Sequence, residues 1–137
     1  MKEIEIEGKK YKIDCSAFTY IKYASFFKIG MIEDLNYIKR YLVKQTLIAQ
    51  KLEKEGKNEI EIYETITQML EKDITELTVK ITQIAWIMIY TANESIMPYE
   101  KWLKTIKKFT LTDKWIVEVA EFAVSTFCWW SFRRRDE

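Results

Sequence analysis

Residues 84–90 read Ile-Ala-Trp-Ile-Met-Ile-Tyr, and this stretch decides the fold. Nearly every position is apolar, so a helix at this place must be covered on several sides. Leu77 and Ile81 extend the apolar pattern upstream at helical spacing. The stretch is far shorter than the roughly 20 apolar residues that a membrane span needs. It therefore predicts the central helix of a helical bundle.

Helical spacing of apolar residues recurs on both sides of this centre. Asp14 or Ser16 can cap a helix that starts near Ala17 and that Gly30 would end. A longer amphipathic segment follows over residues 33–55. With only three glycines and one proline in the chain, helices joined by short loops are expected rather than a sheet with many turns.

Further helix starts are marked by polar residues and by proline. Asn58 with Glu61 and Asp73 with Glu76 have the spacing of a capping box, in which the first side chain accepts from a helix amide and the glutamate reaches back. Two later starts are marked by other signals, namely Pro98 and the pair Thr112 and Asp113.

The N-terminus follows a different period. Residues 3–13 alternate between apolar and charged side chains on both sides of Gly8 and Lys9, which predicts a β-hairpin. Its buried face would consist of Ile4, Ile6, Tyr11 and Ile13. The expected fold is thus one mainly α domain over residues 1–137: a helical bundle, with helices within residues 16–131, and a short N-terminal β-hairpin at residues 2–14.

Composition argues against several classes of function. The 137 residues include 22 basic and 21 acidic ones, so the chain lacks the basic excess typical of nucleic-acid binding. It contains no histidine, which removes the commonest general base and metal ligand. The two cysteines, Cys15 and Cys128, lack a metal-binding spacing and are expected to be buried free thiols in a reducing cytoplasm. We therefore expect no catalytic, cofactor or metal residues and no enzymatic activity.

Two surfaces are candidates for binding another polypeptide. The first is a seam on the helix expected at residues 33–55, formed by Leu35, Ile38, Leu42 and Leu52. That seam fits either a short coiled coil or the core face of an amphipathic helix. The second is the C-terminal end, where large aromatic residues stand beside arginines, a composition enriched in binding hot spots. Its candidate residues are Trp129, Trp130, Phe132 and Arg133.

Among the other three tryptophans, Trp86 and Trp102 are expected in the core. An aromatic content of 15% is also compatible with self-association of the chain, without indicating a stoichiometry.

The order of these segments resembles a known family. A short hairpin and helices precede the segment Ala-Trp-Ile-Met-Ile-Tyr-Thr-Ala at residues 85–92, which is followed by Met-Pro-Tyr-Glu-Lys-Trp-Leu at residues 97–103 and an amphipathic segment at 112–127. This layout resembles the tail assembly chaperones of long-tailed bacteriophages and prophages. Many members of that family are strongly acidic, whereas this chain is balanced in charge.

The resemblance implies a small helical protein without catalytic residues that acts in the cytoplasm of a bacterial host. Its partner would be the tape-measure protein, a long helical chain that the chaperone keeps soluble while the tail tube assembles around it. The alternative is a small helical regulator that binds nucleic acid or another protein, with a basic surface formed by Lys104, Lys107, Lys108, Lys114 and Arg133–Arg135.

Overall fold

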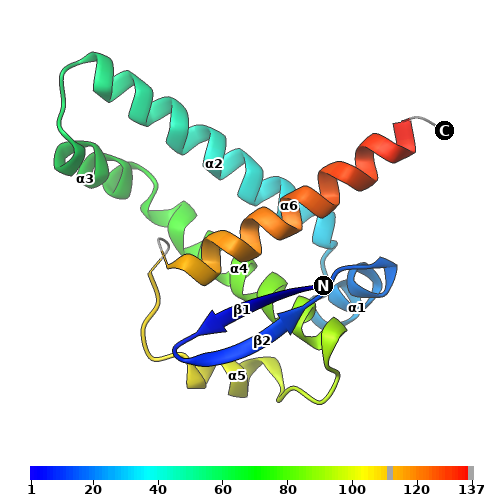
Figure 1. The fold of residues 1–137 in the computed structure, drawn as a ribbon. Helices are drawn as coiled ribbons and strands as arrows, with labels where there is room; N and C mark the ends of the chain where they lie inside the picture. The colour runs from blue at the N-terminus through cyan, green and yellow to red at the C-terminus, as the bar shows by residue number, and fades with distance from the viewer. Residues whose placement is uncertain (111–112, 136–137) are drawn as a thin grey trace.

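The computed structural model of the chain describes the backbone of residues 1–110 and 113–135 and the side chains of residues 1–110 and 113–126. Figure 1 shows the arrangement of the elements in space. In chain order they are β1 (Lys2–Ile6), β2 (Lys9–Ile13), α1 (Ala17–Phe27), α2 (Met31–Lys54), α3 (Glu59–Met69), α4 (Glu71–Ala92), α5 (Tyr99–Thr105) and α6 (Lys114–Arg135). The expected class, a mainly α bundle with a short N-terminal hairpin, is confirmed.

The strands β1 and β2 form the expected antiparallel hairpin. Glu7 and Gly8 connect them with φ angles of 49° and 85°, the positive values that a type I′ turn requires at both central residues. The register pairs Ile4 with Tyr11, and Ile4 itself is 2% exposed. Ile6 and Ile13 are buried on the same face, so the predicted face is confirmed, with Tyr11 only partly covered.

The helix α4 lies at the centre of the bundle. Each residue from Ile84 to Ile89 is buried, and the helix packs against α1, α2, α5, α6 and β2. The backbone N–H of Asp14, at the end of β2, donates to the carbonyl oxygen of Met88 at 3.1 Å. The apolar run of residues 84–90 is therefore enclosed by elements from both ends of the chain, as its composition predicts.

Two helix boundaries differ from the sequence prediction. The helix α1 ends at Phe27, and Lys28 adopts the left-handed conformation with φ of 60°, whereas Gly30 becomes the N-cap of α2. The expected capping box at Asp73 is wrong because α4 starts earlier, at Glu71, which places Asp73 inside its first turn. A buried turn at Leu70 joins α3 directly to α4 and leaves no cap position at Asp73.

The other helix starts follow the sequence signals. The capping box of Asn58 and Glu61 is formed at the start of α3, where the Asn58 side chain accepts from the Glu61 amide at 2.9 Å. Pro98 directly precedes α5, and Asp113 directly precedes α6. Thr112 lies outside the described residues.

The distal half of α2 and the helix α3 form a two-helix arm that projects from the body, as Figure 1 shows. No described residue from 42 to 54 is fully buried, in contrast to Leu35 and Ile38 nearer the body. The arm is thus held together mainly by α2 packing on α3. None of the described helices is long and apolar enough to span a membrane.

The single described cysteine side chain, Cys15, is a free, partly buried thiol. Burial raises its pKa to about 11, which keeps the thiol protonated at neutral pH. The side chain of Cys128 lies outside the described residues.

The hairpin turn is fastened to the segment after α5 by one carboxylate. The Glu7 side chain accepts hydrogen bonds from the backbone N–H of Lys107 at 2.9 Å and of Lys108 at 2.8 Å. These two bonds hold the pKa of Glu7 below its usual value, because they stabilise the charged form. The contact therefore joins residues about a hundred positions apart.

We predict that Met88→Asp destabilises the domain by several kcal/mol, since Met88 is 0% exposed and an unpaired charge would be buried beside the hairpin. Met69→Asp is the matched control, because Met69 is 63% exposed, and it should cost less than about 1 kcal/mol. Urea unfolding followed by circular dichroism measures both. Equal stability of the two variants would show that α4 is not enclosed.

We predict that the Glu7→Gln variant loses less stability than the parent as the pH is lowered. The lowered pKa means that the Glu7 contribution is complete above the usual value of 4.5 and is lost as the pH falls through the folded-state pKa. Thermal unfolding from about pH 6 to pH 3 should show a smaller drop in Tm for Glu7→Gln than for the parent. Glu5→Gln controls for the loss of one hairpin carboxylate. A parent-like slope in Glu7→Gln would contradict the prediction.

Candidate functional site: an apolar groove beside the arm

A groove of about 870 Å³ opens where the arm meets the body. Its walls come from α2, α3, α4 and α6, together with the segment that precedes α6. This volume lies toward the upper end of the range of about 300–1,000 Å³ for binding clefts. The groove is larger than two other hollows, one of about 550 Å³ near Gln50 and one of about 280 Å³ near Val43.

Helices α2 and α3 supply the arm side of the groove. Tyr41 and Ile66 are buried at its base, while Leu42 and Tyr63 are 44% and 65% exposed at its edge. Leu42 and Gln45 are three residues apart on α2, so they lie on one face of that helix. The arm side thus passes from a buried base to an accessible apolar rim.

Helices α4 and α6 supply the opposite wall. On α6, Val117, Ala120 and Val124 recur at spacings of three and four residues and so share one face. Leu77 and Ile81 of α4 are buried beneath them. Val117 itself is 43% exposed, so this wall also has an accessible edge.

At the end of the groove formed by the segment before α6, aromatic side chains pack against one another. Phe109 lines the groove and contacts Trp115 edge to face, with ring centroids 6.1 Å apart. Trp115 in turn contacts Trp102, with ring centroids 6.5 Å apart, and Trp102 of α5 is fully buried. The predicted core positions of Trp86 and Trp102 are confirmed, at 3% and 0% exposed.

The groove is chemically suited to an apolar partner. Glu121 is the one charged residue among its lining side chains, and the other polar groups are hydroxyls and the Gln45 amide. In the described part of the chain no group of three or more cysteine, aspartate or glutamate residues could hold a metal ion. The absence of enzymatic activity stays a prediction.

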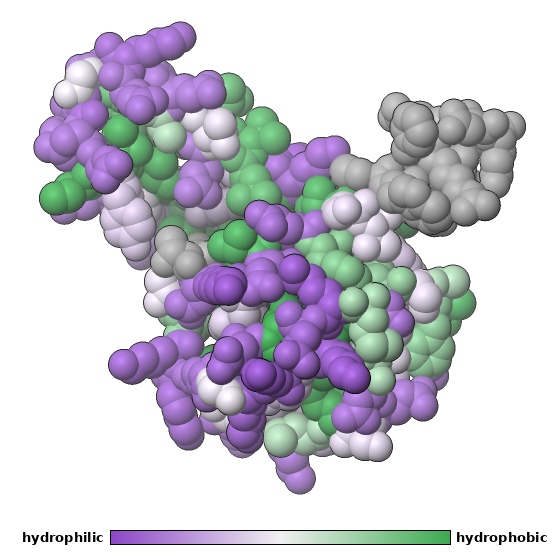
Figure 2. All heavy atoms as spheres, in the orientation of Figure 1, coloured by the Kyte–Doolittle hydropathy of each residue, from purple (hydrophilic) through white to green (hydrophobic). Residues whose placement is uncertain are grey.

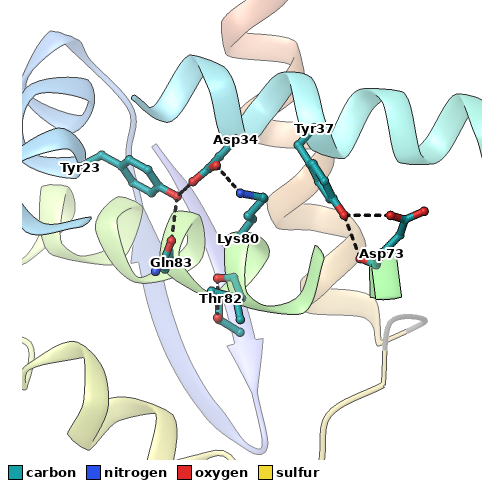
Figure 3. Close-up of polar contacts among 8 residues, drawn as sticks. Tyr23, Asp34, Tyr37, Asp73, Lys80, Thr82 and Gln83 are labelled. Carbon is teal, nitrogen blue, oxygen red and sulfur yellow. Dashed lines mark hydrogen bonds and ion pairs between the residues drawn. The ribbon is translucent and has the colours of Figure 1, made fainter. Parts of the chain in front are cut away.

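A buried ion pair fixes the first turn of α2 against α4, as Figure 3 shows. Asp34 is 1% exposed, and its carboxylate accepts from the Lys80 ammonium at 2.8 Å. The Tyr23 hydroxyl of α1 donates to the other Asp34 oxygen and also lies 3.1 Å from the Gln83 side-chain oxygen. Burial, followed by the contact with Asp34, raises the pKa of Tyr23, so its hydroxyl stays a donor.

A second polar contact lies one turn further along α2. The Tyr37 hydroxyl lies 3.3 Å from the Asp73 carboxylate, which also accepts from Lys44 at 3.3 Å. The Lys80 ammonium stands 5.0 Å from the centre of the Tyr37 ring, within cation–π distance. Together with Asp34, these contacts fix the position of the α2 residues that line the groove.

The sequence-predicted seam residues do not share one surface. Leu35 is 1% exposed and belongs to the core, and Ile38 is 2% exposed at the base of the groove. Leu42 lies at the groove edge, and Leu52 is half-buried near the end of α2. The seam is therefore a core face near the body, as the amphipathic-helix interpretation expects, and an accessible face only beyond Tyr41.

The second predicted surface lies at the end of α6. Trp129, Trp130, Phe132 and Arg133 fall within the bounds of this helix, but their side chains are outside the described residues. Their role in partner binding stays a prediction.

Sequence reasoning missed the residues that complete the groove, chiefly Tyr63, Phe109, Val117 and Val124. A signal existed on α6, because Val117, Ala120 and Val124 form a second apolar stripe beside the core stripe of Ile116, Val119 and Ala123. Two adjacent stripes predict a helix that is covered on one side and accessible on another. No signal of this kind marks Phe109, which reaches the groove through a loop.

Comparisons with known protein families, characterised proteins and solved structures yield no match to this chain.

We predict that Lys80→Met destabilises the protein by about 3–5 kcal/mol, because it leaves the buried Asp34 charge without its partner. Lys72→Met, on an exposed position of the same helix, should change stability by less than about 0.5 kcal/mol. Adding Asp34→Asn to Lys80→Met removes the stranded charge and should recover part of the loss. Urea unfolding of the three variants tests this, and no recovery in the double variant would argue against a charge effect.

Proposed function

We propose that the chain is a polypeptide-binding chaperone whose groove holds an apolar helical segment of a partner protein. The observation that carries this proposal is an open groove of about 870 Å³ with a single charged residue in its lining. Amphipathic helices bind in grooves of this character by burying apolar anchors at positions i, i+3, i+4 and i+7.

The exposed edges support a polypeptide rather than a small polar ligand. Leu42, Tyr63 and Val117 are each more than two-fifths exposed around the same opening. Accessible apolar side chains that border one depression are typical of interaction sites between proteins. A small polar ligand would instead need several charged or hydrogen-bonding groups that converge on it.

The partner that we propose is the tape-measure protein of a phage tail. This step rests on the resemblance of residues 85–92 and 97–103 to tail assembly chaperones. A long, largely helical chain exposes many apolar segments before it is enclosed by the tail tube. A chaperone that covers such segments needs an apolar surface and no catalytic group, which agrees with the lining of the groove.

We predict that co-expression with the chain increases the soluble yield of tape-measure fragments. Leu42→Lys should weaken binding of the responsive fragment by more than tenfold, because a lysine at the groove edge places a charge against the apolar partner. Val79→Lys is the matched control: Val79 is 46% exposed, close to the 44% of Leu42, and does not line the groove.

The readouts are the soluble fraction of each fragment and the Kd measured by titration calorimetry. If no fragment across the whole tape-measure protein gains solubility, this partner is wrong. If a fragment binds equally well to the Leu42→Lys and Val79→Lys variants, the groove is not its site.

A further inference from the structure

The outer face of the arm carries apolar and charged residues that the fold leaves unpartnered. On α2, Arg40, Val43, Leu47 and Lys51 recur at spacings of three and four residues, so they form one stripe. At 100° per residue, this stripe lies on the side of α2 away from Tyr41 and Gln45, which line the groove. Val43 and Leu47 are 53% and 60% exposed. In Figure 2 hydrophobic residues stand among hydrophilic ones on the arm.

The α2 stripe is basic. A shallow hollow of about 280 Å³ lies over Val43 and Leu47, and its other lining residues are Lys39, Arg40 and Lys44. The ion pairs of the arm among the described residues are Lys44–Asp73 and Lys57–Glu61. Arg40 and Lys51 therefore have no acidic partner within ion-pair distance in the described part of the chain.

The helix α3 has the opposite character. Its eleven residues include three glutamates and no lysine or arginine. Ile60 is 71% exposed, the most accessible aliphatic residue of the arm. Exposed Glu64 lies one turn further along the same face of α3, and exposed Glu59 directly precedes Ile60 in the first turn. An apolar side chain with acidic neighbours on α3 thus complements the apolar hollow with basic neighbours on α2.

We propose that two copies of this chain associate through their arms, with α3 of one copy against the outer face of α2 of the other. One chain carries both complementary halves, so a two-fold arrangement would use each contact twice. Ile60 would enter the hollow over Val43 and Leu47, while Glu59 and Glu64 face Arg40 and Lys51. This interface goes beyond the proposed function and uses a face of α2 separate from the groove.

A charge exchange between the two helices tests the proposal. One variant, Arg40→Glu with Lys51→Glu, replaces the two unpaired basic residues of the α2 stripe with acidic ones. A second variant, Glu59→Lys with Glu64→Lys, replaces the two acidic residues of α3 that would face them with basic ones. Either variant alone should self-associate more than tenfold more weakly than the parent, because like charges would meet at the interface. An equimolar mixture of the two should associate again, since each chain then offers the complement of the other.

Sedimentation velocity from low micromolar to several hundred micromolar protein measures the association, and circular dichroism shows that each variant is folded. Lys101→Glu with Lys104→Glu, two exposed positions of α5, is the matched control and should associate like the parent. A parent chain that stays monomeric over the whole range overturns the proposal. So does self-association that survives in both arm variants, or a mixture that fails to associate while both variants are folded. An acidic amphipathic peptide that binds a monomeric parent would identify a different protein as the occupant.

The two sites can be tested separately, because Arg40 and Lys51 lie on the side of α2 away from the groove. On α3, Ile60 is one turn from Tyr63 at the groove edge, so Arg40→Glu with Lys51→Glu is the variant that leaves the groove lining unchanged. If Leu42→Lys loses tape-measure binding but self-associates like the parent, the result bears on the groove and not on the interface between copies. Loss of self-association in the arm variants with unchanged fragment binding would concern this interface alone.

Discussion

The structure depends on one constraint: the stretch at residues 84–90 is apolar on every side and must be covered on every side. A single neighbouring helix cannot satisfy this requirement, because it covers only one side of α4. The hairpin, α1, α2, α5 and α6 each cover part of α4, so that Ala85, Ile87 and Met88 are fully buried. The aromatic residues of α4 and α5 fill the space between these elements, which explains why Trp86 and Trp102 belong to the core.

Only the first part of α2 packs against α4. Beyond Tyr41 the helix leaves the body and packs mainly on α3, with Lys44 still pairing with Asp73 of α4. Two packed helices bury one side of each, and the other sides of both helices stay in water. The groove and the outer face of the arm both follow from this geometry. The buried pair of Asp34 and Lys80 holds the first turn of α2 against α4, two turns before the helix leaves the body.

The sequence predicted the fold class, the hairpin face and most helix starts because these depend on local patterns: alternation at residues 3–13, spacing around residue 84 and the cap at Asn58. It failed where a non-local contact decided the outcome. The buried turn at Leu70 overrode the cap signal of Asp73, and the αL residue Lys28 ended α1 without a glycine. The candidate site was only partly predictable, because Leu42 and Val117 come together through the crossing of α2 and α6, which no local spacing encodes.

The hairpin has a consequence for how the protein forms during synthesis. The hairpin precedes in the chain every residue that holds it: Met88 binds Asp14, Lys107 and Lys108 bind Glu7, and Glu118 of α6 forms an ion pair with Lys2 at 3.4 Å. Contacts between such distant parts of a chain slow folding, because long loops must close first. During synthesis, β1 and β2 therefore gain these stabilising contacts only after α4, the segment that follows α5 and α6 have left the ribosome.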